Sequence, residues 1–475
     1  MKKSIIKNTL ILITLVFFLG SCGTPNTSDS DKSASSTVDT STSDDSTPEA
    51  DTPDSGTSTT PGTPETPPQT NPSEGEQTGS SEGEEPEEEI YNPQPALDLP
   101  LTLKALKNVT INLKFPRSVI NLQYSINEQE RITANNTSNT LDININKGDT
   151  ISFYGEGVKS AFTINCSDDC YVYGNVMSLL YSNFSDKTEI PDDWTFDSLF
   201  KDNSHIKNSP RKKLELPATK LTKSCYHYMF LNCSSLIEAP ELPATTLADA
   251  CYYYMFNNCT SLKAAPVLPA TTVTNSCYYF MFSGCSSLTD VPDLPAKVLE
   301  YGCYENMFRN CSSLKKAPKL SATTLAEGCY WGMFFGCTAL TEAPELPVTK
   351  LEQSCYNCMF YGCSSLKTAP KLPATTLALG CYCQMFRNCS SLTQAPDLPA
   401  QKLTDHCYCN MFYNCSSLKY IKCLATNISE TRCTYQWVEN VPATGTFVKA
   451  ASMSGWQSKT GTDGIPSGWT VQNAN

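Results

Sequence analysis

The sequence has few of the side chains that enzymes most often use for catalysis. It contains only three histidines in 475 residues, and none of them (His205, His227 and His406) stands near a nucleophile motif. A glycine-rich phosphate-binding loop and a cluster of residues with metal-ligand spacing are also missing. The acidic residues of the globular part recur at fixed positions, so none forms a pair set apart by its surroundings. We therefore predict a protein that is not an enzyme and holds no cofactor and no metal.

No apolar run is long enough to cross a bilayer, which takes roughly 20 residues. The run over residues 10–19 is too short, and three lysines precede it, so residues 1–22 are predicted to be a removable signal peptide. The segment ends in Leu-Gly-Ser-Cys22, which resembles the lipobox of bacterial lipoproteins. That resemblance implies cleavage before Cys22 and lipidation of Cys22. An ordinary secretory signal that happens to end near a cysteine is the alternative.

Residues 23–97 contain almost no apolar side chains. They carry 17 acidic residues against one base, Lys32, so their net charge is −16. The whole chain is −13 and the signal segment +3, which leaves residues 98–475 close to neutral. Such a composition buries too little apolar surface to offset the entropy of ordering, and we predict a disordered stalk. Its negative charge argues against nucleic acid as a partner.

From residue 98 the composition becomes that of a globular protein. Apolar and polar residues alternate in four runs, with the apolar members at Val109, Ile111, Leu113 and Phe115, at Leu122, Tyr124 and Ile126, at Leu141, Ile143 and Ile145, and at Ile151 and Phe153. This period of two predicts antiparallel strands with one buried face, so residues 98–175 are expected to form a small antiparallel β-domain. Cys166 and Cys170 near its end are interpreted as a local disulfide or two free thiols, because two thiols alone make no metal site.

A 26-residue unit then repeats eight times without insertion over residues 221–420. Its two cysteines recur at Cys225/Cys233, Cys251/Cys259, Cys277/Cys285, Cys303/Cys311, Cys329/Cys337, Cys355/Cys363, Cys381/Cys389 and Cys407/Cys415. A fixed period of this length predicts a solenoid, in which each unit stacks on the next. Residues 176–220 resemble a degraded copy and are expected to be an N-terminal capping repeat, and residues 421–475 a C-terminal capping segment.

Within one unit, Cys251, Met255 and Cys259 are apolar at a spacing of four, which predicts a helical segment with one buried stripe. The next stretch, from Leu262 to Pro269, contains a recurring proline and predicts a short extended strand. The expected fold class is therefore α+β: a solenoid with a short strand and a helical segment in every repeat, preceded by the small antiparallel β-domain.

The motif Met-Phe-x-x-Cys-Ser-Ser-Leu-x-x-Ala-Pro-x-Leu-Pro-Ala-Thr resembles the BspA-like leucine-rich repeats of bacterial surface proteins. The segments 420–426 and 464–470 are similar to the endings of related Bacteroidetes lipoproteins. The resemblance implies a leucine-rich-repeat solenoid and a role in adhesion or contact with a host surface.

In a stack, equivalent residues of successive repeats form rows, and two rows are candidate ligand contacts. Tyr228, Tyr254 and Phe280 make an aromatic row, and Trp331 occupies the neighbouring position two repeats further on; docking against the β-domain or packing between units is the alternative. The second row carries alternating charges at exposed positions: Asp293, Lys319, Glu345, Lys371 and Asp397. A solvated, self-complementary face explains this second row equally well.

The 24 cysteines of an exported chain invite a disulfide framework. Eight residues of helix would separate the two cysteines of a unit by about 12 Å, beyond disulfide reach, so we predict free thiols in a packed interior. Within the repeats, three further cysteines lie at positions that vary between units: Cys358, Cys383 and Cys409. Pairing of Cys383 with Cys409 stays open.

Together these features predict a monomeric lipoprotein of the bacterial outer membrane, anchored by lipid and exposed at the cell surface. Its solenoid is expected to bind an extracellular protein or glycan, as in adhesion. A glycan-binding accessory of a nutrient-uptake system is the alternative, in which Trp437, Trp456 and Trp469 of the tail stack on sugars. A purely structural coat or spacer is a third possibility.

Overall fold

The computed structural model describes residues 91–115, 121–134, 139–157 and 162–474. The chain divides into two units, residues 1–83 and 84–475, and every described residue belongs to the second. The expected signal peptide, Cys22 and all but the last residues of the expected stalk lie outside the described residues. Within the described part, no helical segment combines the length and the apolar composition of a membrane span.

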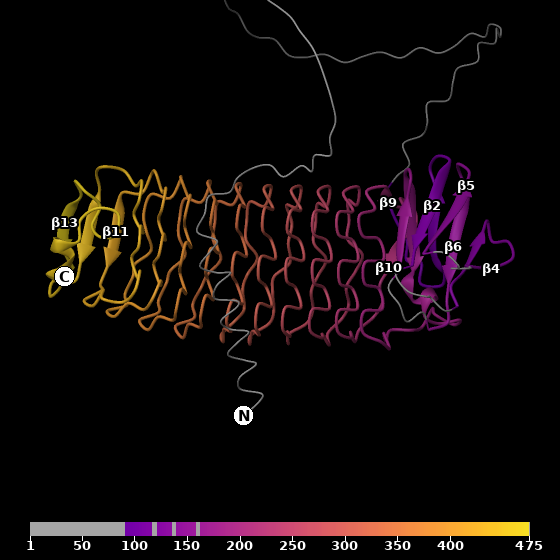
Figure 1. Ribbon diagram of the computed structural model, residues 1–475, viewed down its shortest axis with the longest axis horizontal. Helices are drawn as coiled ribbons and strands as arrows, with labels where there is room; N and C mark the ends of the chain where they lie inside the picture. Colours follow the sequence, from indigo (N-terminus) through magenta and orange to yellow (C-terminus); the bar gives the residue numbers. More distant parts are fainter. Residues whose placement is uncertain (1–90, 116–120, 135–138, 158–161, 475) are drawn as a thin grey trace, which may run out of the picture. The chain divides into compact units, whose positions relative to one another are not determined.

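Short strands gather at the two ends of this unit, and turns stack between them (Figure 1). The strands are β1 (Leu101–Ala105), β2 (Val109–Lys114), β3 (Gln123–Ile126), β4 (Ile132–Thr133), β5 (Thr140–Ile145), β6 (Thr150–Tyr154), β7 (Thr163–Cys166), β8 (Cys170–Asn175), β9 (Ile206–Asn208), β10 (Leu214–Glu215), β11 (Tyr420–Cys423), β12 (Thr446–Lys449) and β13 (Thr470–Asn473). Two 3₁₀ helices, η1 (Val176–Leu179) and η2 (Gly455–Ser458), complete the elements.

The N-terminal β-module contains two sheets. One has the order β5-β2-β7, and the other runs β10-β8-β1-β6-β3-β4, with β9 also paired to β8. The alternation seen in the sequence is confirmed in β2, where Val109, Ile111 and Leu113 are buried and the residues between them are partly exposed. Apolar side chains of both sheets belong to a single core.

Strand β8 joins this module to the solenoid. It is antiparallel to β1 but parallel to β9 and β10, which belong to the expected capping repeat. The residues before β1 are part of the same body: the amides of Asn92 and Gln94 donate to the carbonyls of Pro210 and Arg211, and Ala96 is buried. The core therefore runs without a break from the β-module into the first repeats.

The expected α+β class is wrong, because the repeats contain no α-helix anywhere in the described residues. Residues 250–259 of the second repeat, and their equivalents in the others, form a chain of turns that we name the turn segment. Every second N–H group donates to the next repeat, as Tyr252 does to Cys277 O at 3.0 Å and Tyr254 to Tyr279 O at 2.9 Å. The N–H groups between them donate three residues back, as Tyr253 does to Ala250 O. In an α-helix, every N–H would instead donate to the carbonyl four residues earlier in the same chain.

The spacing of four that favoured a helix has a different origin. Ala250, Tyr254 and Asn258 have φ of 55°, 54° and 58°, so every fourth residue is left-handed and the chain turns once in four residues. Two adjacent side chains per turn, Cys251 with Tyr252 and then Met255 with Phe256, are buried in the core. Left-handed residues exclude a right-handed helix, yet they leave an apolar pattern close to the helical period.

The strand expected over Leu262 to Pro269 is likewise absent. Only single parallel bridges form in this half of the unit, such as Glu238 to Ala264 and Ala264 to Asp290. Pro266 follows the bridge by two residues and has no N–H to extend a ladder, so pairing stops after one residue.

Equivalent residues form continuous buried rows through the stack. The tyrosines that follow the leading cysteines stack with ring centroids 5.5–6.2 Å apart, and the phenylalanines four residues later do so at 5.2–5.9 Å. These distances lie in the favourable range for offset aromatic stacking. Methionine, leucine and the two cysteine rows fill the remaining interior, and the row cysteines are free thiols despite the missing helix.

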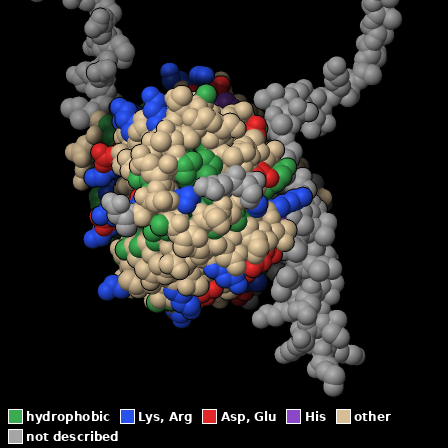
Figure 2. Space-filling model, turned by 90° about the vertical axis from the view of Figure 1, so that its left-hand side faces the viewer, with side chains coloured by type: hydrophobic (Ala, Val, Ile, Leu, Met, Phe, Trp, Pro, Cys, Tyr) green, Lys and Arg blue, Asp and Glu red, His purple; other side chains and the backbone are tan. Residues whose placement is uncertain are grey.

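Strands β11, β12 and β13 form a parallel sheet at the C-terminal end. Trp437 stacks on Tyr408 of the last repeat at 6.2 Å and on Trp456 at 5.6 Å, so indole rings close the core. Figure 2 shows this end, where charged side chains of both signs surround a centre that includes hydrophobic atoms. Strand β13 is exposed along its whole length.

Candidate binding surface

Seven aromatic side chains gather on the turn segments of the first three repeats and the preceding cap: Trp194, His227, Tyr228, Tyr253, Tyr254, Tyr279 and Phe280. We name this surface the aromatic patch. Six of them are partly buried, and Trp194 is 45% exposed. The structure thus brings together Tyr228, Tyr254 and Phe280, as expected from the sequence.

The patch consists of two neighbouring rows. In one, Tyr228 lies 5.4 Å from Tyr254, and Tyr254 stacks on Phe280 at 4.7 Å with an interplanar angle of 4°. In the other, Tyr253 stacks on His227 at 5.0 Å and on Tyr279 at 4.6 Å. Since the rings stack along the solenoid, their faces are largely covered and their edges point outward.

The capping repeat adds the ring of Trp194 and the carboxylate of Asp197 to the patch. Trp194 meets His227 edge-on at 5.1 Å. Asp197 lies 2.9 Å from the Nδ1 of His227 and holds the imidazole in place. Neither His227 nor Trp194 was a sequence-based candidate: Trp194 lies in the degraded capping repeat, and His227 stands at a regular repeat position whose row was not selected.

Three of these residues occupy a backbone position that disfavours them. Tyr228, Tyr254 and Phe280 have φ of 55°, 54° and 53°. The same position in the later repeats holds Asn306, Gly332 and Asn410, which suit a left-handed conformation, but also Cys358 and Gln384. A bulky side chain there costs about 1–2 kcal/mol. Three successive repeats thus carry an aromatic side chain at a strained backbone position, which makes this row a candidate functional surface.

Burial raises the pKa of two acidic groups in and beside the patch, Tyr254 and Glu305. It raises the pKa of Tyr254 to about 12, so the phenol stays a hydrogen-bond donor at neutral pH. At the C-terminal edge of the patch, Glu305 follows Tyr279 in the same row and is only 5% exposed. Burial raises the pKa of Glu305 to about 8, partly opposed by a hydrogen bond from Tyr279.

Trp331, the fourth aromatic candidate, is not part of this patch. Its row position follows Glu305, which separates it from Tyr279, and its side chain is partly buried.

The row of alternating charges lies half a repeat further along the chain. Its five members are all exposed: Asp293, Lys319, Glu345, Lys371 and Asp397. Within the described part of the chain, their side chains form no ion pair with one another. The backbone N–H of Lys319 donates to Asp293 at 2.9 Å, and Asp397 pairs with Lys422 at 2.7 Å. Nothing joins this row to the aromatic patch, so its role as a ligand contact stays a prediction.

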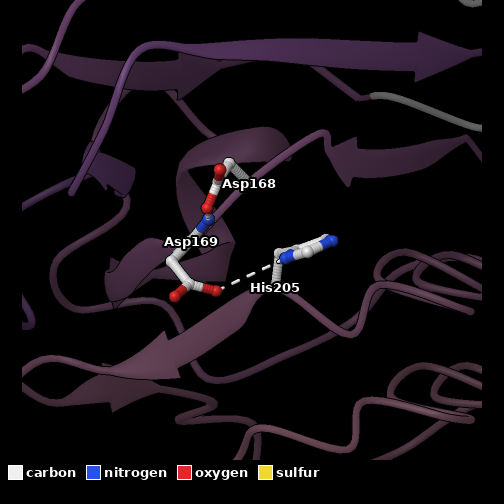
Figure 3. Close-up of side chains that lie close together, drawn as sticks. All are labelled: Asp168, Asp169 and His205. Atoms are coloured by element: carbon white, nitrogen blue, oxygen red, sulfur yellow. Dashed lines mark hydrogen bonds and ion pairs between the residues drawn. The ribbon is translucent and has the colours of Figure 1, made fainter.

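A separate polar cluster, which the sequence did not indicate, lies at the connection between β7 and β8, strands of different sheets. Asp168, Asp169 and His205 place potential metal-ligand atoms within 4.8 Å of one another, and Asp169 approaches His205 Nδ1 to 3.3 Å (Figure 3). However, Lys107 and Lys207 already pair with the two carboxylates at 3.0 and 2.6 Å.

Hydrogen bonds and the lysines explain the acidity of this cluster. The Asp169 amide and then Lys107 lower the pKa of Asp168, and Lys207 lowers that of Asp169. The cluster is therefore a charge-balanced ion-pair network. His205 reaches it through the parallel pairing of β8 with β9, a long-range contact without a sequence signal.

The tail tryptophans do not offer a glycan platform. Trp437 and Trp456 have no exposed surface, and Trp469 is 6% exposed. Their indole N–H groups donate to the carbonyls of Gly464, Ala425 and Pro442. In this structure they are core residues, and the stacking on sugars considered from the sequence is not possible.

Comparison with known proteins gives a family for the repeats. A model described as the BspA type leucine-rich repeat region, six copies, matches residues 198–315, 223–367 and 333–435, which together span half of the chain. No curated protein and no solved structure matches the chain. The matched repeats are associated with protein interaction rather than catalysis. With its unbroken rows of equivalent side chains and this match, the chain belongs to the BspA-type leucine-rich-repeat family.

Proposed function

We propose that the protein is a lipid-anchored protein of the bacterial outer membrane that binds extracellular macromolecules through the aromatic patch, as in adhesion. The repeat family supports a role in protein binding or adhesion in general. The sequence of residues 1–22 supports the anchor at Cys22, and the acidic segment after it supports a stalk that holds the solenoid away from the membrane.

The observation that carries the binding proposal is the aromatic row at left-handed positions. Tyr228, Tyr254 and Phe280 each sit where asparagine or glycine would cost less. Stacking offsets part of that cost, at about 0.5–1.5 kcal/mol for an aromatic pair. Tyrosine and tryptophan are also enriched at the centres of protein interfaces.

The orientation of the rings favours a protein over a glycan as the ligand. A sugar stacks on an open ring face, but the faces of Tyr254 and Tyr253 are covered by Phe280 and Tyr279. Ring edges remain accessible, and these suit the apolar side chains of a protein partner.

The test replaces the three strained residues with asparagine. The variant Tyr228→Asn, Tyr254→Asn and Phe280→Asn keeps the turn, because asparagine tolerates a left-handed conformation. We expect an unchanged thermal midpoint together with loss of binding to immobilised laminin, collagen or fibronectin. The matched control is Tyr435→Ala, which removes an exposed tyrosine outside the patch. Equal binding by the triple variant and the native chain would refute the assignment of the patch.

The anchor is tested separately in cells. Cys22→Ala should abolish incorporation of radiolabelled palmitate and release the protein from the membrane fraction. Protease added to intact cells should digest the anchored native protein if the solenoid faces outward. Resistance in intact cells, with digestion after lysis, would place it on the inner side.

A further inference from the structure

A second row of side chains begins where the aromatic patch ends. Arg309, Phe335, Tyr361, Arg387 and Tyr413 occupy one position of the turn segment in five successive repeats. We name them the arginine row. The guanidinium of Arg309 lies over Phe335 at 3.8 Å, Phe335 stacks on Tyr361 at 4.3 Å, and Arg387 lies between Tyr361 at 5.6 Å and Tyr413 at 4.2 Å.

The two guanidiniums are held in place but are not neutralised. Arg309 donates to Asn306 Oδ1 at 3.3 Å, and Arg387 donates to Gln384 Oε1 at 3.4 Å. Neither forms an ion pair with a carboxylate of the described residues. The Nε of Arg387 is buried without a hydrogen-bond partner. Because a guanidinium carries five N–H donors, each arginine has unused donors on a preorganised, planar group.

Glu305, the acid in the turn before Arg309, does not balance the charge of Arg309. Glu305 precedes Arg309 by one turn, and burial raises the pKa of Glu305 to about 8. It is therefore mostly protonated at pH 7 and leaves the charge of Arg309 exposed to an incoming anion.

The spacing of the arginines defines the ligand. Three repeats separate Arg309 from Arg387, which corresponds to about 15 Å at the usual distance between neighbouring strands. An extended peptide covers that distance with about four residues. Phe335 and Tyr361 cover each other's faces, so the surface between the arginines offers ring edges, which suit apolar side chains better than sugar rings.

We propose that the arginine row binds an extended acidic peptide segment of a partner protein, with two carboxylates four residues apart and an apolar residue midway between them on the same face of the peptide. Each carboxylate takes a bidentate pair of hydrogen bonds from one guanidinium. The inference rests on the proposed function, since it gives the chemistry of the protein partner, but it concerns residues outside the aromatic patch.

The experiment measures the anisotropy of a fluorescein-labelled peptide, Gly-Glu-Thr-Leu-Thr-Glu-Gly, with the full chain in detergent micelles; in an extended peptide its leucine shares a face with both glutamates. Arg309→Gln with Arg387→Gln should weaken binding at least about tenfold, and replacing both peptide glutamates by glutamine should have a similar effect. The charge-matched control, Lys315→Gln with Lys367→Gln, removes two exposed cations that lie outside the turn segments and should leave affinity unchanged. Arg309→Lys with Arg387→Lys keeps the charge without the planar fork, and should bind weakly.

Three results would overturn the proposal. The first is an equal loss of binding in the lysine control, which would show attraction by net charge alone. The second is no peptide binding by the native chain while dextran sulfate binds through the same arginines, which would make the ligand an anionic glycan. The third is full binding by the Arg→Lys variant. The asparagine variant of the aromatic patch should bind the peptide normally, so failure of the proposed function is distinguishable from failure here.

Discussion

The thiol of Cys311 donates a hydrogen bond to the backbone carbonyl of Phe282 in the preceding repeat, over 3.2 Å. The same bond recurs in every repeat, from Cys233 with Phe200 at 3.0 Å to Cys415 with Phe386 at 3.0 Å. Cysteine is small and apolar enough for the interior and still provides a weak donor for a buried carbonyl. The thiols of the trailing cysteine row thus hydrogen-bond each repeat to the preceding one without a covalent bond.

The row thiols should resist chemical modification in the folded protein. Burial raises the pKa of Cys225 and of Cys337 to about 12, so at pH 8 the reactive thiolate is scarce as well as inaccessible. We expect Ellman's reagent to leave the 16 row thiols untouched in buffer and to label them all in guanidinium chloride. The variant Cys358→Ser removes the signal of a partly exposed cysteine. Fewer labelled thiols in unfolded, unreduced protein would instead reveal disulfides.

Glu305 should make the protein less stable as pH rises. Its pKa is about 8 in the folded chain against 4.5 for the free side chain, so the folded state binds more protons between these values. Stability is then highest below pH 4.5 with respect to this group, and it falls as pH increases toward 8, by a few kcal/mol at most. The tyrosines whose charge interacts with it, Tyr253, Tyr254, Tyr279 and Tyr301, titrate above this window.

Urea unfolding at pH 5 and pH 8 measures this effect. The slope should flatten in Glu305→Gln, which keeps the shape of the side chain and cannot ionise. Glu300→Gln is the matched control, because Glu300 is exposed and should leave the slope unchanged. A native slope retained in Glu305→Gln would show that another group is responsible.

Substitutions at Gly336 test whether the turn segment needs a residue that tolerates a left-handed conformation at this position. Its φ is 71°, and an added Cβ would come within 2.2 Å of Asn310 Oδ1. Gly336→Ala should therefore destabilise the protein by about 1–3 kcal/mol, from backbone strain and displacement of Asn310. Gly362 has the same φ but no side-chain neighbour, so Gly362→Ala should cost less.

Asparagine should rescue the same site. At the equivalent position Asn258 donates to Asn232 Oδ1 at 3.0 Å, and Asn414 donates to Asn388 at 2.9 Å. Gly336→Asn can extend this ladder to Asn310 and should be closer to the native stability than Gly336→Ala in thermal unfolding. Equal midpoints for all three variants would refute the role of the left-handed turn.

Two adjacent phenylalanines should respond very differently to truncation. Phe334 has no exposed surface and stacks between Phe308 and Phe360, so Phe334→Ala should cost about 3–5 kcal/mol. Phe335 is partly exposed and contacts Arg309 and Tyr361, so Phe335→Ala should cost about 1 kcal/mol. Denaturant titration of both variants gives the comparison. Similar costs would contradict the assignment of rows to core and surface.

The sequence was sufficient to predict the stack and its rows, because a fixed period places equivalent residues side by side whatever the local backbone. It was insufficient to predict the backbone itself. Cys251, Met255 and Cys259 show the spacing of four shared by helices and by consecutive four-residue turns. The distinguishing signal was the row of asparagine and glycine at positions such as Asn258, Gly284 and Gly336, residues that favour a left-handed conformation.

The candidate surface was predictable only in part, for a related reason. Tyr228, Tyr254 and Phe280 fall at one repeat position and were visible in the sequence as a row. The arginine row is also regular, but Arg309 and Arg387 are three repeats apart. Only their contacts with aromatic rings of the same row identify them as members of one surface. Trp194 comes from the cap, whose register depends on backbone bonds such as Phe196 N–H to Cys225 O.

The direction of the backbone bonds between repeats also bears on how such chains change in length. Each turn segment donates N–H groups forward, and the following one receives them at its carbonyls, as Tyr304 does to Cys329 and Tyr330 to Cys355. Every joint is therefore interchangeable, and excision or duplication of one 26-residue module regenerates the joint that was cut. Gene recombination can lengthen or shorten the array in whole modules while both ends keep their original closures.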